Sequence, residues 1–103
     1  MYTLEYLPLA KQDMVEIVRY ISKELKSPAT AKKLATEMIA AAENLIAFPY
    51  AKAMHIPPKP LKREYRRLVV KNYIMFYWVD ENKKTIVIAR VIYARRDFDH
   101  LLI

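Results

Sequence analysis

The chain has 103 residues, of which 18 are Lys or Arg and 11 are Asp or Glu, giving a formal net charge of +7. This length fits one domain, 1–103, and the absence of cysteine and glycine excludes disulfide scaffolds, thiolate metal sites and glycine-rich phosphate loops. No apolar run approaches the roughly 20 residues of a membrane span, and the first residues lack the pattern of a secretion signal. We therefore expect a cytoplasmic protein without a membrane partner.

The first half of the chain predicts a strand followed by two helices. Alternating apolar residues over 3–7 indicate a short strand, and Pro8 suits the first turn of a helix over 9–25. Ser27 and Pro28 form a helix start, and an apolar, alanine-rich stripe carries the second helix to Phe48. The short connection predicts an antiparallel helical hairpin.

The second half predicts a proline-rich loop and three strands. The loop covers 49–60, and the strands cover 61–70, 73–79 and 85–93, separated by short polar turns. Tight turns between consecutive strands indicate an antiparallel meander. We expect an α+β, two-layer fold of order β-α-α-β-β-β, with the helical hairpin packed on one face of a mostly antiparallel sheet and a short C-terminal helix or tail.

The positive charge is concentrated in one part of the chain. Residues 1–50 carry six basic and six acidic side chains, whereas 51–79 carry seven basic residues and one acid, Glu64. Alternation on the predicted strand over 61–70 places Arg63, Tyr65 and Arg67 on one face, and we expect the solvent face to carry two or three cations. A localised basic block favours an anionic partner, and a solubilising surface is the alternative.

Several kinds of chemistry are disfavoured by the residues present. The two histidines, His55 and His100, are isolated in the sequence, so neither a metal site nor a Ser/His/Asp site is expected, and no cofactor is predicted. Arg90 stands in an otherwise apolar row with Ile86, Ile88 and Ile92. Either it forms an internal ion pair, with Glu5 or Glu64, or its planar fork contacts a phosphate.

Two stretches resemble a known family. The stretch from Tyr65 to Asp80, YRRLVVKNYIMFYWVD, resembles the pattern YR-x-L-x-V-x-NY-x-x-FY-x-V-D of RelE/ParE toxins. The stretch from Ile88 to Asp97, IARVIYARRD, is similar to the family ending I-x-RV-x-HARRD. Ala10, Asp13 and the second helix match the family's first half, so the resemblance covers essentially the whole chain.

The resemblance implies the toxin of a type II toxin–antitoxin system, a plasmid-stabilising or growth-inhibiting protein neutralised by a cognate antitoxin. RelE-type members cleave mRNA on the ribosome, and ParE-type members poison DNA gyrase without being enzymes. The alanine-rich second helix, the Arg95-Arg96-Asp97 ending and a C-terminal segment without tyrosine favour the gyrase target. A ribosome-dependent endoribonuclease is the alternative, and a non-toxic nucleic-acid-binding module or a degenerate antitoxin-binding module is a third.

The candidate residues follow from both readings. If the protein is a nuclease, the catalytic candidates are Arg66, Arg67, Arg90, Arg95, Arg96 and His100. The candidates for binding a target or nucleic acid are Lys62, Arg63, Arg66, Arg67, Lys71, Arg90, Tyr93, Arg95 and Arg96.

Overall fold

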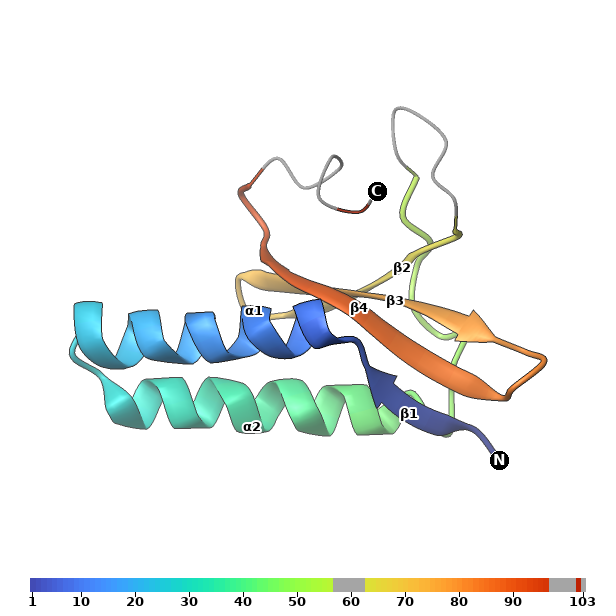
Figure 1. The fold of residues 1–103 in the computed structure, drawn as a ribbon, viewed down its shortest axis with the longest axis horizontal. Coiled ribbons are helices and arrows are strands. Elements are labelled where there is room, and N and C mark those ends of the chain that lie inside the picture. The colour runs from blue at the N-terminus through green and yellow to red at the C-terminus, as the bar shows by residue number, and fades with distance from the viewer. Residues whose placement is uncertain (57–62, 97–101, 103) are drawn as a thin grey trace.

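The computed structural model, which describes residues 1–56, 63–96 and 102, has the α+β architecture expected from the sequence (Figure 1). Its elements are β1 (Thr3–Tyr6), α1 (Pro8–Arg19), the π-helical η1 (Tyr20–Glu24), α2 (Pro28–Asn44), β2 (Arg66–Val70), β3 (Tyr73–Asp80) and β4 (Thr85–Tyr93). The sheet order is β1-β4-β3-β2, with β1 parallel to β4 and the other pairs antiparallel. The mostly antiparallel sheet is thereby confirmed.

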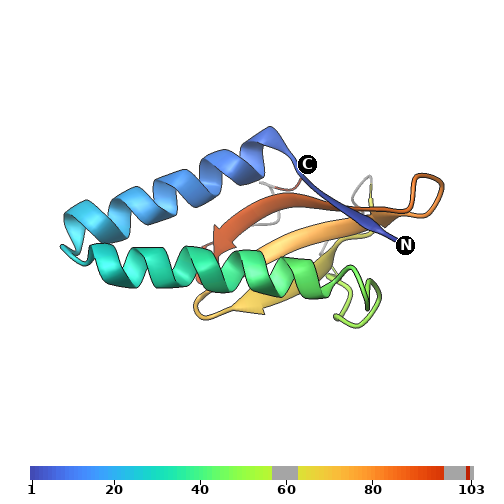
Figure 2. The ribbon, with the colours of Figure 1, turned by 90° about the horizontal axis from the view of Figure 1, so that it is seen from below.

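The two helices form an antiparallel hairpin whose far end projects beyond the sheet (Figures 1 and 2). The first helix begins at Pro8, as predicted, and continues through η1 to Glu24. Lys26 then takes a left-handed conformation with φ of 52°, which reverses the chain. Ser27 occupies the N-cap position of α2, but its hydroxyl donates to Thr30 Oγ1 at 2.6 Å and not to a helix amide.

The predicted end of the second helix at Phe48 is wrong, because α2 ends at Asn44. Beyond it the amides of Leu45, Ile46 and Phe48 donate to carbonyls three residues earlier, which makes tight turns. The residue before a proline disfavours helical geometry, and Pro49 follows Phe48 directly. The carbonyl of Pro49 accepts a hydrogen bond of 2.9 Å from the buried Tyr77 hydroxyl, which draws the chain back to the sheet.

The predicted strand over 61–70 is also corrected, because β2 begins only at Arg66, and residues 57–62 lie outside the described part. The edge of β2 is instead covered by the segment after α2, where Met54 forms an antiparallel bridge with Arg66. The Arg67 amide donates to Ala53 at 3.0 Å, and the His55 amide donates to Tyr65 at 2.8 Å. The loop therefore protects a strand edge that would otherwise expose unpaired backbone groups.

One core lies between the helices and the sheet. Its buried side chains come from both helices and all three consecutive strands. They include Ala10, Ile21, Leu34, Met38, Leu45, Leu68, Met75, Tyr77, Ile86 and Ile88. This packing explains why α1 and α2 have apolar stripes at helical spacing.

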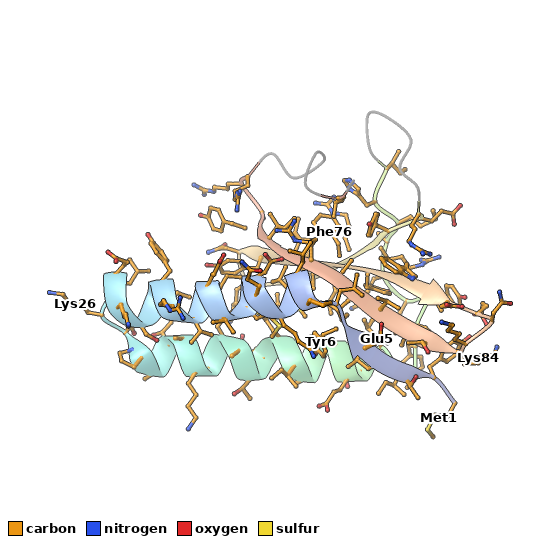
Figure 3. All side chains as sticks on the ribbon, in the orientation of Figure 1. Met1, Glu5, Tyr6, Lys26, Phe76 and Lys84 are labelled. Atoms are coloured by element: carbon orange, nitrogen blue, oxygen red, sulfur yellow. The ribbon has the colours of Figure 1, made fainter. Side chains whose placement is uncertain are left out.

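The opposite face of the sheet holds a second core, so the expectation of one plainly solvent-exposed face is wrong. This cluster consists of Tyr65, Ile74, Phe76, Ala89, Ile92 and Leu102. Figure 3 shows Phe76 on the side of the sheet away from α2. A sheet that is buried on both faces shows continuous apolar strands, as in β3 and β4.

A β-bulge in β4 overturns the predicted facing of its residues. Phe76 lies opposite Arg90 while its neighbour Tyr77 lies opposite Ile88, so Ala89 is the extra residue. An extra residue shifts the alternation by one position. Ile86 and Ile88 therefore face the helices, whereas Ile92 belongs to the cluster on the other face.

Candidate functional site

The β-bulge places two of the candidate arginines in one row across the sheet. Arg67 on β2 lies opposite Phe76 on β3, and Phe76 lies opposite Arg90 on β4. Two strand spacings separate the arginine backbones by about 10 Å. Phe76 between them is fully buried, and it forms a T-shaped contact with the His55 ring at a centroid distance of 5.2 Å.

Arg90 is engaged by a carboxylate on α1. Its Nε lies 2.8 Å from Asp13 Oδ2, and its Nη2 lies 2.9 Å from Asp13 Oδ1, a bidentate pair. Asp13 Oδ2 also accepts a hydrogen bond of 2.9 Å from the Val91 amide. Val91 lies after Ile88, the last residue of β4 that is paired with β1. The ion pair foreseen for Arg90 exists, but its partner is Asp13 and not Glu5 or Glu64. The hydrogen bonds that Arg90 donates to Asp13 raise the pKa of the Arg90 guanidinium.

Arg66 is engaged by the segment that follows α2. Its Nη1 donates to the Lys52 carbonyl at 2.7 Å and approaches the Tyr50 carbonyl at 3.4 Å. Its guanidinium carbon lies 5.0 Å from the Tyr50 ring centroid, which is within cation–π range. Arg66 therefore ties this segment to the edge of the sheet.

Arg63, just before β2, is exposed and lies over an aromatic ring. Its guanidinium carbon is 4.3 Å from the Trp78 ring centroid. Trp78 in turn makes an edge contact with Tyr65, whose hydroxyl donates to the Leu102 carbonyl at 3.1 Å. The cluster on the far face of the sheet thus ends in an exposed cation.

Other candidates gather near the distal end of the hairpin. Lys71, Tyr93 and Arg96 line a groove of about 960 Å³, whereas Arg95 is exposed in the turn that follows β4. The groove lies between the hairpin and the ends of β3 and β4, and its apolar wall includes Ile17 and Tyr73. Lys71 Nζ lies 3.9 Å from Glu37 Oε2, a solvent-exposed ion pair. Two candidates from the sequence, Lys62 and His100, lie outside the described residues.

A surface cluster at the opposite end was not foreseen from the sequence. Glu81 accepts hydrogen bonds from the Tyr2 and Tyr50 hydroxyls and from Lys84 Nζ. The hydrogen bond from Lys84, with those from the tyrosines, lowers the pKa of Glu81 to about 2. The hydrogen bond to Glu81 raises the pKa of Tyr50 to about 12. The cluster joins the chain before β1, the segment after α2 and the β3–β4 turn, and Figure 3 shows Lys84 and Met1 at the same end of the molecule.

Sequence reasoning also missed the roles of Asp13 and His55. The burial of Asp13 could have been predicted from the sequence, because this residue lies within the apolar stripe of α1 between Ala10 and Ile17. A carboxylate on a buried stripe requires a buried cationic partner. His55 had no signal, since it stands in a loop without periodicity and is buried only by the tertiary fold.

The described residues limit the chemistry of the surface. Among them, no three His, Cys, Asp or Glu side chains lie together as a metal site would require. Within the same ranges, the helices are too short or too polar to cross a bilayer. The candidate surface is rich in guanidinium groups. Those of Arg66 and Arg90 are bonded internally, and that of Arg63 is exposed over the Trp78 ring.

Comparison with solved structures places this fold among bacterial toxins. The chromosomal ParDE toxin–antitoxin system of Pseudomonas aeruginosa contains a chain with TM-score 0.74 and 20% identity, covering 92% of this chain and 98% of that one. A chain of the intact RelBE toxin–antitoxin complex of Escherichia coli has a TM-score of 0.56 and 18% sequence identity, and the match covers 93% of this chain and 100% of that one. A chain of the RelBE2 toxin–antitoxin complex of Mycobacterium tuberculosis has a TM-score of 0.53 and 22% sequence identity, and the match covers 89% of this chain and 90% of that one. Among curated proteins, none matches this sequence.

A family model gives the assignment that structural likeness alone does not. The model for the ParE toxin of type II toxin–antitoxin systems, parDE, matches residues 4–98. The match spans β1, the helical hairpin and all three strands of the meander. The chain therefore belongs to the ParE toxin family of type II toxin–antitoxin systems, within the RelE/ParE superfamily.

Proposed function

We propose that this toxin acts in the cytoplasm by binding DNA gyrase, that it is not an enzyme, and that a cognate antitoxin neutralises it. The observation that carries the proposal is the internal use of two candidate catalytic arginines. Arg90 has two of its N–H groups on Asp13, and Arg66 is held by the Lys52 carbonyl and the Tyr50 ring. The ParE family model supports the same target.

The internal bonds disfavour phosphate chemistry for a physical reason. A cation that stabilises a phosphoryl transition state must direct donors at the oxygens where charge develops. An arginine bound bidentately by a buried carboxylate has its fork and its charge already compensated. Releasing Arg90 would leave Asp13 buried without its partner, and breaking a buried pair costs about 3–5 kcal/mol.

The antitoxin is proposed to dock in the groove beside the helical hairpin. The groove, of about 960 Å³, has apolar walls from Ile17 and Tyr73 and cations at its rim, Lys71 and Arg96. Partly exposed apolar side chains rimmed by polar ones are typical of protein-binding grooves. The related chain from Escherichia coli was solved in an intact toxin–antitoxin complex, which supports a partner of this kind.

The second candidate function is a ribosome-dependent endoribonuclease, and one observation favours it. Arg67 and Arg90 flank Phe76 in a single row, so two cations lie on one face of the sheet. On this reading Arg67, Arg95 and Arg96 would contact RNA, and the protein would be an enzyme. A module that binds antitoxin or nucleic acid without toxicity is the third reading.

Induction in cells separates these three readings. We expect growth arrest with gyrase-dependent double-strand breaks and intact message, and purified toxin should inhibit gyrase supercoiling. Cleaved message at ribosome-bound codons with intact DNA would establish the nuclease instead. Normal growth on induction, with antitoxin binding retained, would identify the non-toxic module. As a matched variant, Arg67→Ala should keep its toxicity if gyrase is the target and lose it if RNA is cleaved, provided that thermal melting shows it folded.

A further inference from the structure

The Arg63–Trp78 contact presents a cation that is held on a ring and that forms no ion pair with another described residue. Arg63 is exposed, and its guanidinium carbon lies 4.3 Å from the centroid of the indole ring. Among the described residues the ion pairs are Lys71–Glu37, Lys84–Glu81 and Arg90–Asp13, and Arg63 belongs to none of them. Stacking uses the face of the guanidinium and leaves its in-plane N–H donors for another group.

The ring beneath Arg63 is itself fixed. Trp78 makes an edge contact with Tyr65 at 5.8 Å, and Tyr65 makes another with Phe76 at 6.4 Å. Tyr65 is buried, and its hydroxyl bonds to the Leu102 carbonyl. A side chain held on an ordered ring loses less conformational entropy on binding than a free arginine. The cation is therefore preorganised for contact with an external anion.

The surroundings favour a protein carboxylate over single-stranded nucleic acid. Recognition of unpaired bases depends on exposed aromatic faces. Here Arg63 covers a face of Trp78 and Arg66 lies over Tyr50, while Tyr65 and Phe76 are buried. Arg66 is bonded to the Lys52 carbonyl, so it is not available as a second cation beside Arg63 for a run of phosphate contacts.

We propose that Arg63, held on Trp78, contacts a carboxylate of the target protein, which is gyrase if the proposed function is right. The inference rests on that function and adds the residue through which the toxin recognises an acidic surface. Arg66, whose guanidinium is bonded to the fold, is a positioning residue for the neighbouring segment and makes no such contact. The two arginines, only three positions apart, therefore have different roles.

Binding of the purified toxin to purified DNA gyrase by calorimetry tests the proposal. Arg63→Ala should weaken binding about tenfold, the change that accompanies loss of about 1.4 kcal/mol. Arg63→Lys should lose less, because it keeps the charge without the planar fork. Arg63→Glu should lose more than Arg63→Ala. Arg19→Ala, which removes an exposed arginine from α1, is the matched control and should bind as the wild type.

The outcomes separate this inference from the choice of target. If the wild type does not bind gyrase, both ideas fail. If the wild type binds and Arg63→Ala binds equally well, only the Arg63 contact fails. If Arg63→Ala loses affinity for single-stranded RNA and not for gyrase, the partner is nucleic acid and the proposal is overturned. Arg63→Gln, which keeps much of the apolar stem, replaces Arg63→Ala if circular dichroism shows that the latter is unfolded.

Discussion

The two faces of the sheet are stabilised in different ways. The face under the helices is packed with aliphatic side chains such as Met38, Ile86 and Ile88. The opposite face adds the aromatic rings of Tyr65, Phe76 and Trp78 to aliphatic side chains such as Ile74 and Ile92. His55 makes an edge contact with Phe76, and Arg63 lies over the Trp78 ring. The first face therefore depends on burial of aliphatic surface, and the second combines burial with cation–π and edge-to-face contacts.

This difference shows why the number of cations is a poor guide to the binding surface. Arg66 and Arg90 are guanidinium side chains like Arg63, but the first bonds to backbone carbonyls and the second to Asp13. Arg66 and Arg90 therefore stabilise the fold on the two outer strands of the meander, β2 and β4. Only a guanidinium left without such a partner has its full charge available for another molecule.

The largest expected effect concerns the bond between α1 and the edge of β4. Asp13→Ala removes two hydrogen bonds to Arg90 and one to the Val91 amide, and leaves a partly buried cation uncompensated. We expect the free energy of unfolding to fall by about 3–5 kcal/mol. Urea denaturation followed by circular dichroism measures this change.

The neighbouring acid on α1 provides the control. Glu16→Ala removes an exposed carboxylate from the same helix and should change the free energy of unfolding by no more than about 0.5 kcal/mol. Replacing Asp13 with Ala at a cost below about 1 kcal/mol would mean that the ion pair does not join the two layers.

A smaller effect compares one tyrosine from each face. Tyr77 donates to the Pro49 carbonyl on the helix side, and Tyr65 donates to the Leu102 carbonyl on the far side. Each change to Phe keeps the ring and leaves one carbonyl without its donor, so each should cost about 1 kcal/mol. Equal losses in thermal melting would show that both faces are equally ordered. A loss confined to Tyr77→Phe would show that the far face is held more loosely.

A gain in stability is expected at the tip of the helical hairpin, which contributes only to the helix-covered face. Lys26 has φ of 52°, a left-handed conformation that glycine adopts without steric cost. Lys26→Gly should raise the free energy of unfolding by about 0.5–1 kcal/mol. Lys32→Gly, within α2, is the control and should lower it by about 1 kcal/mol. Destabilisation by Lys26→Gly in chemical denaturation would contradict this explanation of the turn.

The smallest effect is the alkaline limit of stability. Burial raises the pKa of both Tyr65 and Tyr77 above the ordinary value of 10.0. Above pH 10 the unfolded chain loses these protons more readily than the folded one, so the free energy of unfolding falls as pH rises through the folded pKa values. Urea midpoints measured from pH 8 to pH 11 should decline, and less steeply in Tyr77→Phe. Midpoints that stay constant in the wild type would argue against the burial of both hydroxyls.

Local patterns were sufficient to predict most of the secondary structure. Apolar spacing and Pro8 gave the first helix, and the short polar turns gave the meander. Patterns failed where long-range contacts intervened. The Tyr77 hydroxyl holds Pro49 beyond the end of α2, and the bridge between Met54 and Arg66 takes the place of the longer strand expected from 61. Both contacts join residues at least twelve positions apart, which no local period can reveal.

For the candidate site, the sequence alone determined which residue types were available and that positive charge gathers after residue 50. Only the tertiary structure decided what each cation does. The bulge at Ala89 placed Arg90 opposite Phe76, and α1 brought Asp13 to its guanidinium. The physical reason is that charge is a property of composition, whereas compensation of charge depends on which groups the fold brings within hydrogen-bonding distance.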